Sequence, residues 1–150
     1  MSKSQKNIDK LVDLVEAALN SRGKAKSNDA LGNVIYIDSS VYSKQALEAF
    51  IQLSISQFNQ IPHFTFFTLE DQKFIDLFTE VLVEGAILYA LSSQALLERG
   101  REFKIEDHGV YMDPPAVSEM LSTQYSILLT HHFEKLKLIK GEIQTFKVKK

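Results

Sequence analysis

The sequence predicts a mainly α chain of about four helices packed as a bundle, with one short β-hairpin and an extended terminal arm. Apolar residues recur at helical spacing over four long segments, and near residue 103 their period changes from about 3.6 toward 2. The chain has 150 residues, of which 45% are hydrophobic and 24% charged. These values are typical of one globular domain, so we expect residues 1–150 to form a single domain.

The first helix is predicted from Ser4 or Asn7 to about Asn20, where apolar residues follow a helical period. Residues 21–33 contain two glycines among polar side chains, which favours a loop. We therefore expect residues 1–33 to be an N-terminal helix followed by a flexible loop.

Residues 34–37 form a short β-branched and aromatic run, which indicates a short strand or an extended connector. Ser43 is a suitable N-cap for a second helix that ends before Pro62, because the residue before a proline disfavours helical geometry. Residues 61–67 carry three phenylalanines around this proline without a helical period. We expect them to form a buried connector.

Thr68 is predicted to cap a third helix of about 30 residues, roughly 45 Å long, that ends near Gly100. This length is unusual for a small domain, so a break near Glu84 and Gly85 is an alternative. Small residues on this helix allow close approach by another helix. They are Gly85, Ala86, Ala90, Ser92, Ser93 and Ala95.

After Gly100 the alternating pattern and the turn at residues 106–109 predict a small β-hairpin. Asp113 followed by two prolines is a helix start, and the last helix is predicted to stop at Gly141. Residues 142–150 then form a basic C-terminal arm. Such an arm either adds as a strand to a partner's edge or is frayed, and the pattern leaves both open.

Charge is unevenly distributed along the chain. Residues 1–26 hold six basic and three acidic side chains, a net charge of +3, and residues 134–150 hold six lysines and two glutamates, a net charge of +4. The residues between them hold five basic and fourteen acidic side chains, a net charge of −9. The simpler interpretation is that the charged helix faces and terminal lysines are solvated and keep the protein soluble. The sharper one is head-to-tail contact between copies, with basic ends on acidic bodies.

The sequence contains no recognisable catalytic motif. There is no phosphate-binding glycine loop, no GxSxG elbow and no HExxH pair, and the chain has no cysteine. His131 and His132 point about 100° apart on a helix and are not expected to join Glu80 and Glu84 around one metal. His132 lies on the apolar face and is predicted to be a core histidine. We therefore expect no enzyme activity, catalytic residue, metal or cofactor.

The chain resembles the head-to-tail connector proteins of tailed bacteriophages, the adaptor or neck-ring proteins that dock below the portal. The resemblance spans about residues 43–140, and the chain departs from the simplest adaptor pattern in the strand-like residues 34–37 and in its first helix. The residues that carry it are Gly85, Ala86 and Ile87 with Ala90 and Leu91, then Leu96, Leu97 and Glu98, then Gly100, Arg101, Glu102 and Phe103, then Asp107, His108 and Gly109.

This resemblance implies a structural virion subunit that assembles in the host cytoplasm. Its partners would be other copies in a ring, commonly a dodecamer, the portal protein and other neck or tail proteins, with DNA passing through without specific binding. The absence of an apolar signal segment and of a run long enough to span a bilayer predicts a soluble protein without membrane contact.

Exposed apolar and basic side chains are the candidates for a subunit or portal interface, and acids near the hairpin are the candidates for the wall of a DNA channel. The interface candidates are Phe64, Phe66, Phe67, Arg99, Arg101, Tyr111, Phe146, Lys147 and Val148. The channel candidates are Glu102, Glu106 and Asp107.

The main rival is a nucleic-acid-binding or DNA-packaging accessory protein, with basic residues near the C-terminus on phosphates. Those residues would be Lys135, Lys137, Lys140, Lys147, Lys149 and Lys150. A helical enzyme with an unrecognised site is the third hypothesis.

Overall fold

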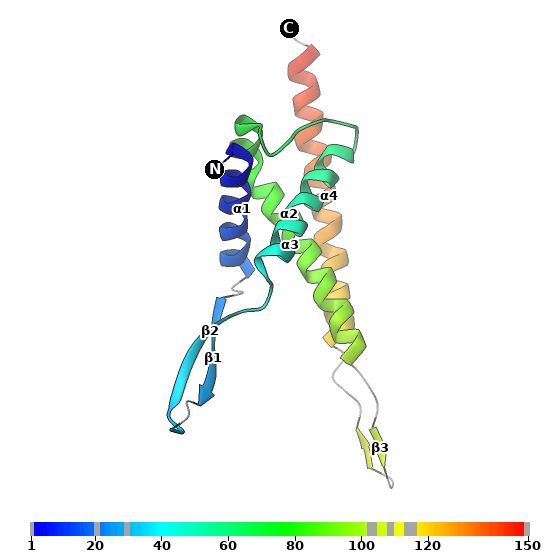
Figure 1. Cartoon of the computed structure of the whole chain (residues 1–150). Coiled ribbons are helices and arrows are strands. Elements are labelled where there is room, and N and C mark those ends of the chain that lie inside the picture. Colours follow the sequence, from blue (N-terminus) through cyan, green and yellow to red (C-terminus); the bar gives the residue numbers. More distant parts are fainter. Residues whose placement is uncertain are drawn as a thin grey trace.

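The computed structural model describes residues 2–19, 22–28, 31–101, 105–107, 110–112 and 117–148. The side chains of residues 22–28, 35–40, 101, 105–107, 110–112 and 144–148 lie outside the description. Within the described residues the chain is mainly helical with four helices, as the sequence predicts (Figure 1). The predicted fold class is confirmed at this level.

Helix α1, Lys3–Leu19, begins where the hydroxyl of Ser2 accepts a hydrogen bond from the backbone N–H of Gln5 at 3.2 Å. Its apolar face is buried, because its hydrophobic residues repeat at helical spacing. The buried residues are Asn7, Ile8, Leu11, Val12 and Val15.

Strands β1, Arg22–Asn28, and β2, Val34–Ser40, form an antiparallel pair in which Arg22 is opposite Ser40. The prediction that residues 21–33 are a flexible loop is therefore wrong for β1. Polar residues such as those of β1 have little intrinsic tendency to form a strand, but β2 needs a partner for its backbone groups. Gly32, with φ of 82°, lies in the connection between the two strands.

Helix α2, Lys44–Gln60, starts as predicted at Ser43, whose hydroxyl accepts a hydrogen bond from the N–H of Ala46 at 3.2 Å. Its C-cap is Ile61, directly before Pro62, and the Ile61 N–H still donates to the Gln57 carbonyl at 3.0 Å.

Helix α3, Gln72–Arg101, is one uninterrupted helix of 30 residues, so the alternative of a break near Gly85 is wrong. It begins later than predicted, because Thr68 and Asp71 first close a turn: the Thr68 N–H donates to Oδ2 of Asp71 at 2.8 Å. The carbonyl of Asp71 then accepts from Ile75 at 3.0 Å, which makes Asp71 the first residue of the helical hydrogen-bond pattern.

Strands β3, Ile105–Asp107, and β4, Val110–Met112, pair antiparallel between α3 and α4, with Ile105 opposite Met112. This pair lies where the sequence predicts a hairpin. The predicted turn residues 108–109 and the Asp113, Pro114 and Pro115 helix start lie outside the described residues.

Helix α4, Val117–Val148, has 32 residues and passes through Gly141. The predicted stop at Gly141 and the extended arm over residues 142–148 are therefore wrong. A glycine ends a helix when it takes a positive φ, and among the described glycines only Gly32 does so. Gly141 instead costs the helix about 1 kcal/mol relative to alanine, which a helix that packs over most of its length tolerates.

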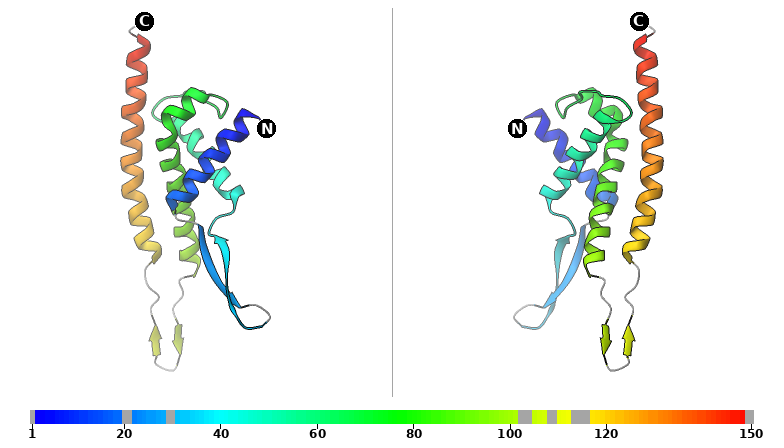
Figure 2. Two further views of the ribbon diagram at one scale, coloured as in Figure 1. Left: turned by 90° about the vertical axis from the view of Figure 1, so that its left-hand side faces the viewer. Right: turned by 90° about the vertical axis from the view of Figure 1, so that its right-hand side faces the viewer.

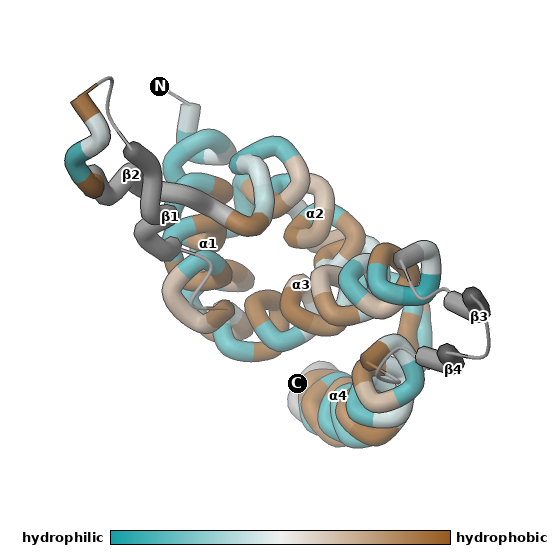
Figure 3. Tube along the Cα trace, turned by 90° about the horizontal axis from the view of Figure 1, so that it is seen from below, coloured by the Kyte–Doolittle hydropathy of each residue, from teal (hydrophilic) through white to brown (hydrophobic). Residues whose placement is uncertain are grey.

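The helices form layers around α3. Helix α4 packs along one side of α3, whereas α1 and α2 pack on the other side (Figures 2 and 3). Both strand pairs extend toward one end of the molecule, and the C-terminal end of α4 lies at the opposite end (Figure 1). The central position of α3 explains its length, because it supplies the surface against which all three other helices pack.

The hydrophobic core lies between α1, α2 and α3 and continues to Leu136 of α4. An aromatic cluster closes one end of it: Phe67 stacks on Phe74 with ring centroids 4.6 Å apart, and Phe58 meets Phe74 edge to face at 5.2 Å. Such pairs contribute about 0.5–1.5 kcal/mol each beyond the burial of their area.

Candidate interaction surface

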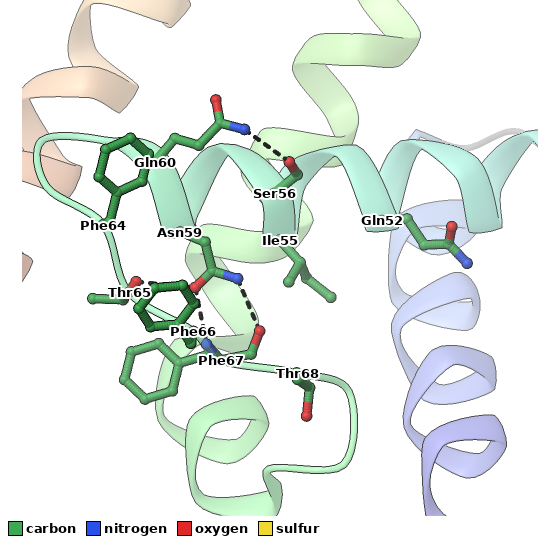
Figure 4. Close-up of a pocket in the computed structure, with 10 residues that line it drawn as sticks. All are labelled: Gln52, Ile55, Ser56, Asn59, Gln60, Phe64, Thr65, Phe66, Phe67 and Thr68. Carbon is green, nitrogen blue, oxygen red and sulfur yellow. Dashed lines mark hydrogen bonds between the residues drawn. The ribbon is translucent and has the colours of Figure 1, made fainter.

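The loop between α2 and α3 is held in place by Asn59, near the end of α2. Its side-chain Nδ2 donates to the Phe67 carbonyl at 2.8 Å, and its Oδ1 accepts from the Phe67 N–H at 3.0 Å and from the Thr65 hydroxyl at 2.9 Å (Figure 4). The Asn59 carbonyl also accepts from the Thr65 N–H at 2.8 Å. Four hydrogen bonds to one residue give this loop a defined conformation.

This conformation separates the three phenylalanines of the loop. Phe67 turns inward onto Phe74, whereas Phe64 and Phe66 are 77% and 90% exposed. The prediction of a buried connector is thus wrong for Phe64 and Phe66. Burying a phenylalanine side chain stabilises a fold by about 1.5–3 kcal/mol. Because Phe64 and Phe66 are exposed, neither contributes this stabilisation.

A hollow of about 520 Å³ lies beside the two exposed rings (Figure 4). None of the residues that line it is charged, and amide and hydroxyl groups alternate with apolar side chains. The lining residues are Gln52, Ile55, Ser56, Asn59, Gln60, Phe64, Thr65, Phe66, Phe67 and Thr68.

The absence of charge extends well beyond the hollow. Residues 49–69 contain no Asp, Glu, Lys or Arg, although many of them are exposed. Protein surfaces are ordinarily rich in charged side chains, whereas the centres of protein interfaces are depleted of charge and enriched in aromatic residues. We call the exposed part the α2 surface, defined by Gln52, Leu53, Ser56, Gln60, Phe64 and Phe66.

On its other side the loop is held by Lys140 of α4. The Lys140 Nζ donates to the His63 carbonyl at 2.7 Å and lies 5.1 Å above the centre of the Phe58 ring. The side chain is fully buried, and burial lowers the pKa of Lys140 to about 8. Within the described residues no carboxylate pairs with it, so its contacts tie α4 to the loop through neutral partners.

A second polar cluster joins α3 to α4. Lys135 Nζ donates to Glu80 at 2.6 Å and to Glu84 at 2.9 Å, and these carboxylates raise the pKa of Lys135. His132 is 1% exposed, as predicted for a core histidine, and its Nδ1 lies 3.3 Å from Oε1 of Glu84 without hydrogen-bonding geometry. Burial lowers the pKa of His132, and the effect of Glu84 opposes it only in part.

Gly85 lies where α2, α3 and α4 meet. A Cβ at this position would overlap the hydroxyl of Ser54 and approach Nε2 of His132 to 3.3 Å. The Ser54 hydroxyl meanwhile donates to the Leu82 carbonyl at 2.8 Å. The close helix approach predicted from the small residues of this segment is confirmed at Gly85.

The remaining predicted site residues are only partly described. Arg99 lies exposed near the end of α3. For the rest, either the residue or its side chain lies outside the description, so they stay predictions. They are Arg101, Glu102, Glu106, Asp107, Tyr111, Phe146, Lys147 and Val148.

The basic set proposed for phosphate binding is reduced by the fold. Lys140 is buried and Lys135 is engaged by two carboxylates, so neither is available for phosphates, while Lys137 is exposed. The side chain of Lys147 and the residues Lys149 and Lys150 lie outside the description.

Comparison with protein-family models, with curated proteins and with solved structures finds no match to this chain. In the part of the chain that the structure describes, no cluster of three or more His, Asp or Glu side chains is arranged to hold a metal ion. None of the described helices is both long and apolar enough to cross a membrane.

Proposed function

We propose that this chain is a non-enzymatic structural subunit that assembles with copies of itself into a ring. The more specific form of the proposal is a head-to-tail connector in the virion of a tailed bacteriophage, between portal and tail, with DNA passing through. The α2 surface is the contact that we assign to this assembly.

The exposure of Phe64 and Phe66 on a clamped loop is the observation that supports this proposal most strongly. Large aromatic side chains dominate the binding energy of protein interfaces, and they act best when they are already held in place. Asn59 holds the loop in the conformation in which these rings are exposed. Their surroundings contain no charge that would need to be stripped of water on contact.

The arrangement of the elements agrees with a subunit whose ends make different contacts. The strand pairs lie at one end of the molecule and the C-terminal end of α4 lies at the other (Figure 1). In the sequence, residues 134–150 carry a net charge of +4, six lysines against two glutamates. A basic end can bind the acidic portion of a neighbouring protein, and an acidic channel wall would repel DNA.

Native mass spectrometry and light scattering of the purified chain test the proposal. We expect a homo-oligomer for the wild type and a monomer for Phe66→Asp, because the aspartate would place an unpaired charge in the contact. Leu77→Asp is the matched control: Leu77 of α3 is 75% exposed and lies outside the α2 surface, so this variant should assemble normally. A wild-type chain that stays monomeric at high concentration, alone and with a portal ring, would contradict the proposal.

Nucleic-acid binding through the C-terminal lysines is the alternative. Its affinity would fall steeply with salt, because phosphate contacts release counterions. A fluorescence-anisotropy titration with duplex DNA at two salt concentrations separates the two functions. Salt-sensitive binding by a monomer, lost in Lys137→Gln, would favour the alternative.

A further inference from the structure

The outer face of α4 forms a second exposed surface without charge. Met120, Gln124, Ile127, Leu128 and His131 are all exposed, and their spacing places them on one side of the helix. Residues 120–133 contain no Asp, Glu, Lys or Arg. We call these five residues the α4 surface.

Packing within the chain does not account for the α4 surface. Helix α4 contacts α3 through its opposite side, where Ser118, His132, Leu136 and Lys140 are buried. Ile127, in the middle of the α4 surface, is 54% exposed. The apolar groups on this outer side thus contribute nothing to the core that the structure describes.

We infer that the α4 surface of one copy binds the α2 surface of the next copy. The inference rests on the proposed function and identifies the second half of its subunit contact.

Matched chemistry is the first argument for this pairing. Both surfaces combine apolar side chains with amide, hydroxyl or imidazole groups, and neither brings a carboxylate, ammonium or guanidinium group into the contact. A charged partner would lose its hydration on either surface without gaining a counter-charge. The amides of Gln52, Gln60 and Gln124 can satisfy one another by hydrogen bonding.

Placement is the second argument. Helix α4 lies on one side of α3 and α2 lies on the other, so the two surfaces belong to helices on opposite sides of α3 (Figures 2 and 3). A copy can therefore offer one surface to each of two neighbours, which is the geometry of a heterologous contact that can close a ring. Self-pairing of either surface would end at a dimer and leave the other surface uncovered.

A mixing experiment with two single-surface variants tests the inference. Phe66→Asp disables the α2 surface and Ile127→Asp disables the α4 surface. Each variant alone should be monomeric by native mass spectrometry, and the equimolar mixture should form a one-to-one heterodimer. The mixture allows only one contact. The intact α4 surface of Phe66→Asp can bind the intact α2 surface of Ile127→Asp.

Controls separate misfolding from loss of contact. Circular dichroism of both variants should match the wild type, and so should their thermal midpoints at a protein concentration where the wild type is also monomeric, since each replaced side chain is more than half exposed. Gln124→Lys is a second α4-surface variant that removes no apolar group, and it should also weaken assembly at least tenfold. Leu77→Asp should leave both the oligomer and the mixing result unchanged.

The possible failures are distinguishable. If Ile127→Asp alone forms the wild-type oligomer, the α4 surface is not the partner and the inference is overturned, while the proposed assembly stands. If both variants are monomeric but their mixture stays monomeric, the two surfaces do not bind each other, and the inference is also overturned. A wild type that stays monomeric both alone and with a portal ring overturns the proposed function together with the inference.

Discussion

The inner face of α4 and the outward face of α2 reverse the usual distribution of residue types. Along α4 the chain buries His132 against α3 and Lys140 against the α2–α3 loop, and it places the pair of Glu84 and Lys135 at the edge. On the α2 surface it exposes Phe64 and Phe66. The interior contact is thus rich in polar groups, whereas the solvent-facing surface is aromatic and uncharged.

This difference indicates two separate tasks. Polar contacts fix the alignment of α4, because a shift by one helical turn would separate Lys140 from the His63 carbonyl and Lys135 from Glu80 and Glu84. The exposed rings add nothing to that alignment. Their exposure agrees with the contact between copies that we propose for the α2 surface.

The largest difference in stability is expected between the replacement of a buried and of an exposed phenylalanine by alanine. Phe58→Ala should lower the free energy of unfolding by about 3–5 kcal/mol, because Phe58 is almost completely buried in the aromatic cluster. Phe66→Ala should change it by less than about 0.5 kcal/mol. Urea denaturation at a concentration where the chain is monomeric measures both, and a comparable loss for Phe66→Ala would show that the loop packs inward in solution.

Gly85→Ala should be the next largest effect. Alanine favours a helix by about 1 kcal/mol over glycine, but the added Cβ would overlap the Ser54 hydroxyl, so we expect a net loss of about 1–3 kcal/mol. Gly141→Ala is the matched control, since a Cβ there meets nothing within 4 Å, and it should raise stability by about 0.4–1 kcal/mol. Equal effects at the two glycines would refute the close approach at Gly85.

Lys140→Met should give a smaller effect of opposite sign. The pKa of Lys140 falls from 10.5 to about 8 on folding, so the unfolded chain binds more protons between these values. The contribution of Lys140 to the stability of the wild type should therefore rise with pH between about 8 and 10.5, and it should lower the stability throughout the range below pH 8. Methionine removes the cost of burying a charged Lys140, roughly 3 kcal/mol, but leaves the His63 carbonyl unpaired. We therefore expect the free energy of unfolding to increase by about 1–2 kcal/mol at pH 7.

The decisive measurement for Lys140 is the difference between the two proteins across the pH range. Thermal unfolding from pH 7 to 10.5 should show the advantage of Lys140→Met shrinking as pH rises, because the other titrating groups are shared. A constant difference would mean that Lys140 keeps its ordinary pKa and is hydrated.

The helices could be predicted from the sequence because each carries a period that depends only on which face is buried. The core position of His132 was predictable for the same reason, and Ser43 was predictable because a serine hydroxyl can accept a hydrogen bond from the first turn of a helix. Strand β1 was not, since its polar residues form a strand only because β2 lies beside them. Gly141 misled the prediction because a glycine stops a helix only when its φ becomes positive.

The α2 surface was predictable only in part. Three closely spaced phenylalanines indicate aromatic contact, but which of them turns outward depends on the hydrogen bonds of Asn59, which no spacing rule shows. The burial of Lys140 was hidden for a similar reason, because a lysine near a chain end looks like a solvated side chain. The long stretch without charge at residues 49–69 was the signal that could have located the surface.

The clamp at Asn59 has a consequence for the thermodynamics of association. Ordering a flexible loop on binding costs conformational entropy, about 1–2 kcal/mol for each backbone residue that becomes fixed. Here that cost is met when the chain folds, because the hydrogen bonds of Asn59 exist before any partner arrives. Copies that meet through this loop would therefore bind nearly as rigid bodies. We expect a negative heat-capacity change from burial of the Phe64 and Phe66 side chains, and little entropic loss from ordering of the loop.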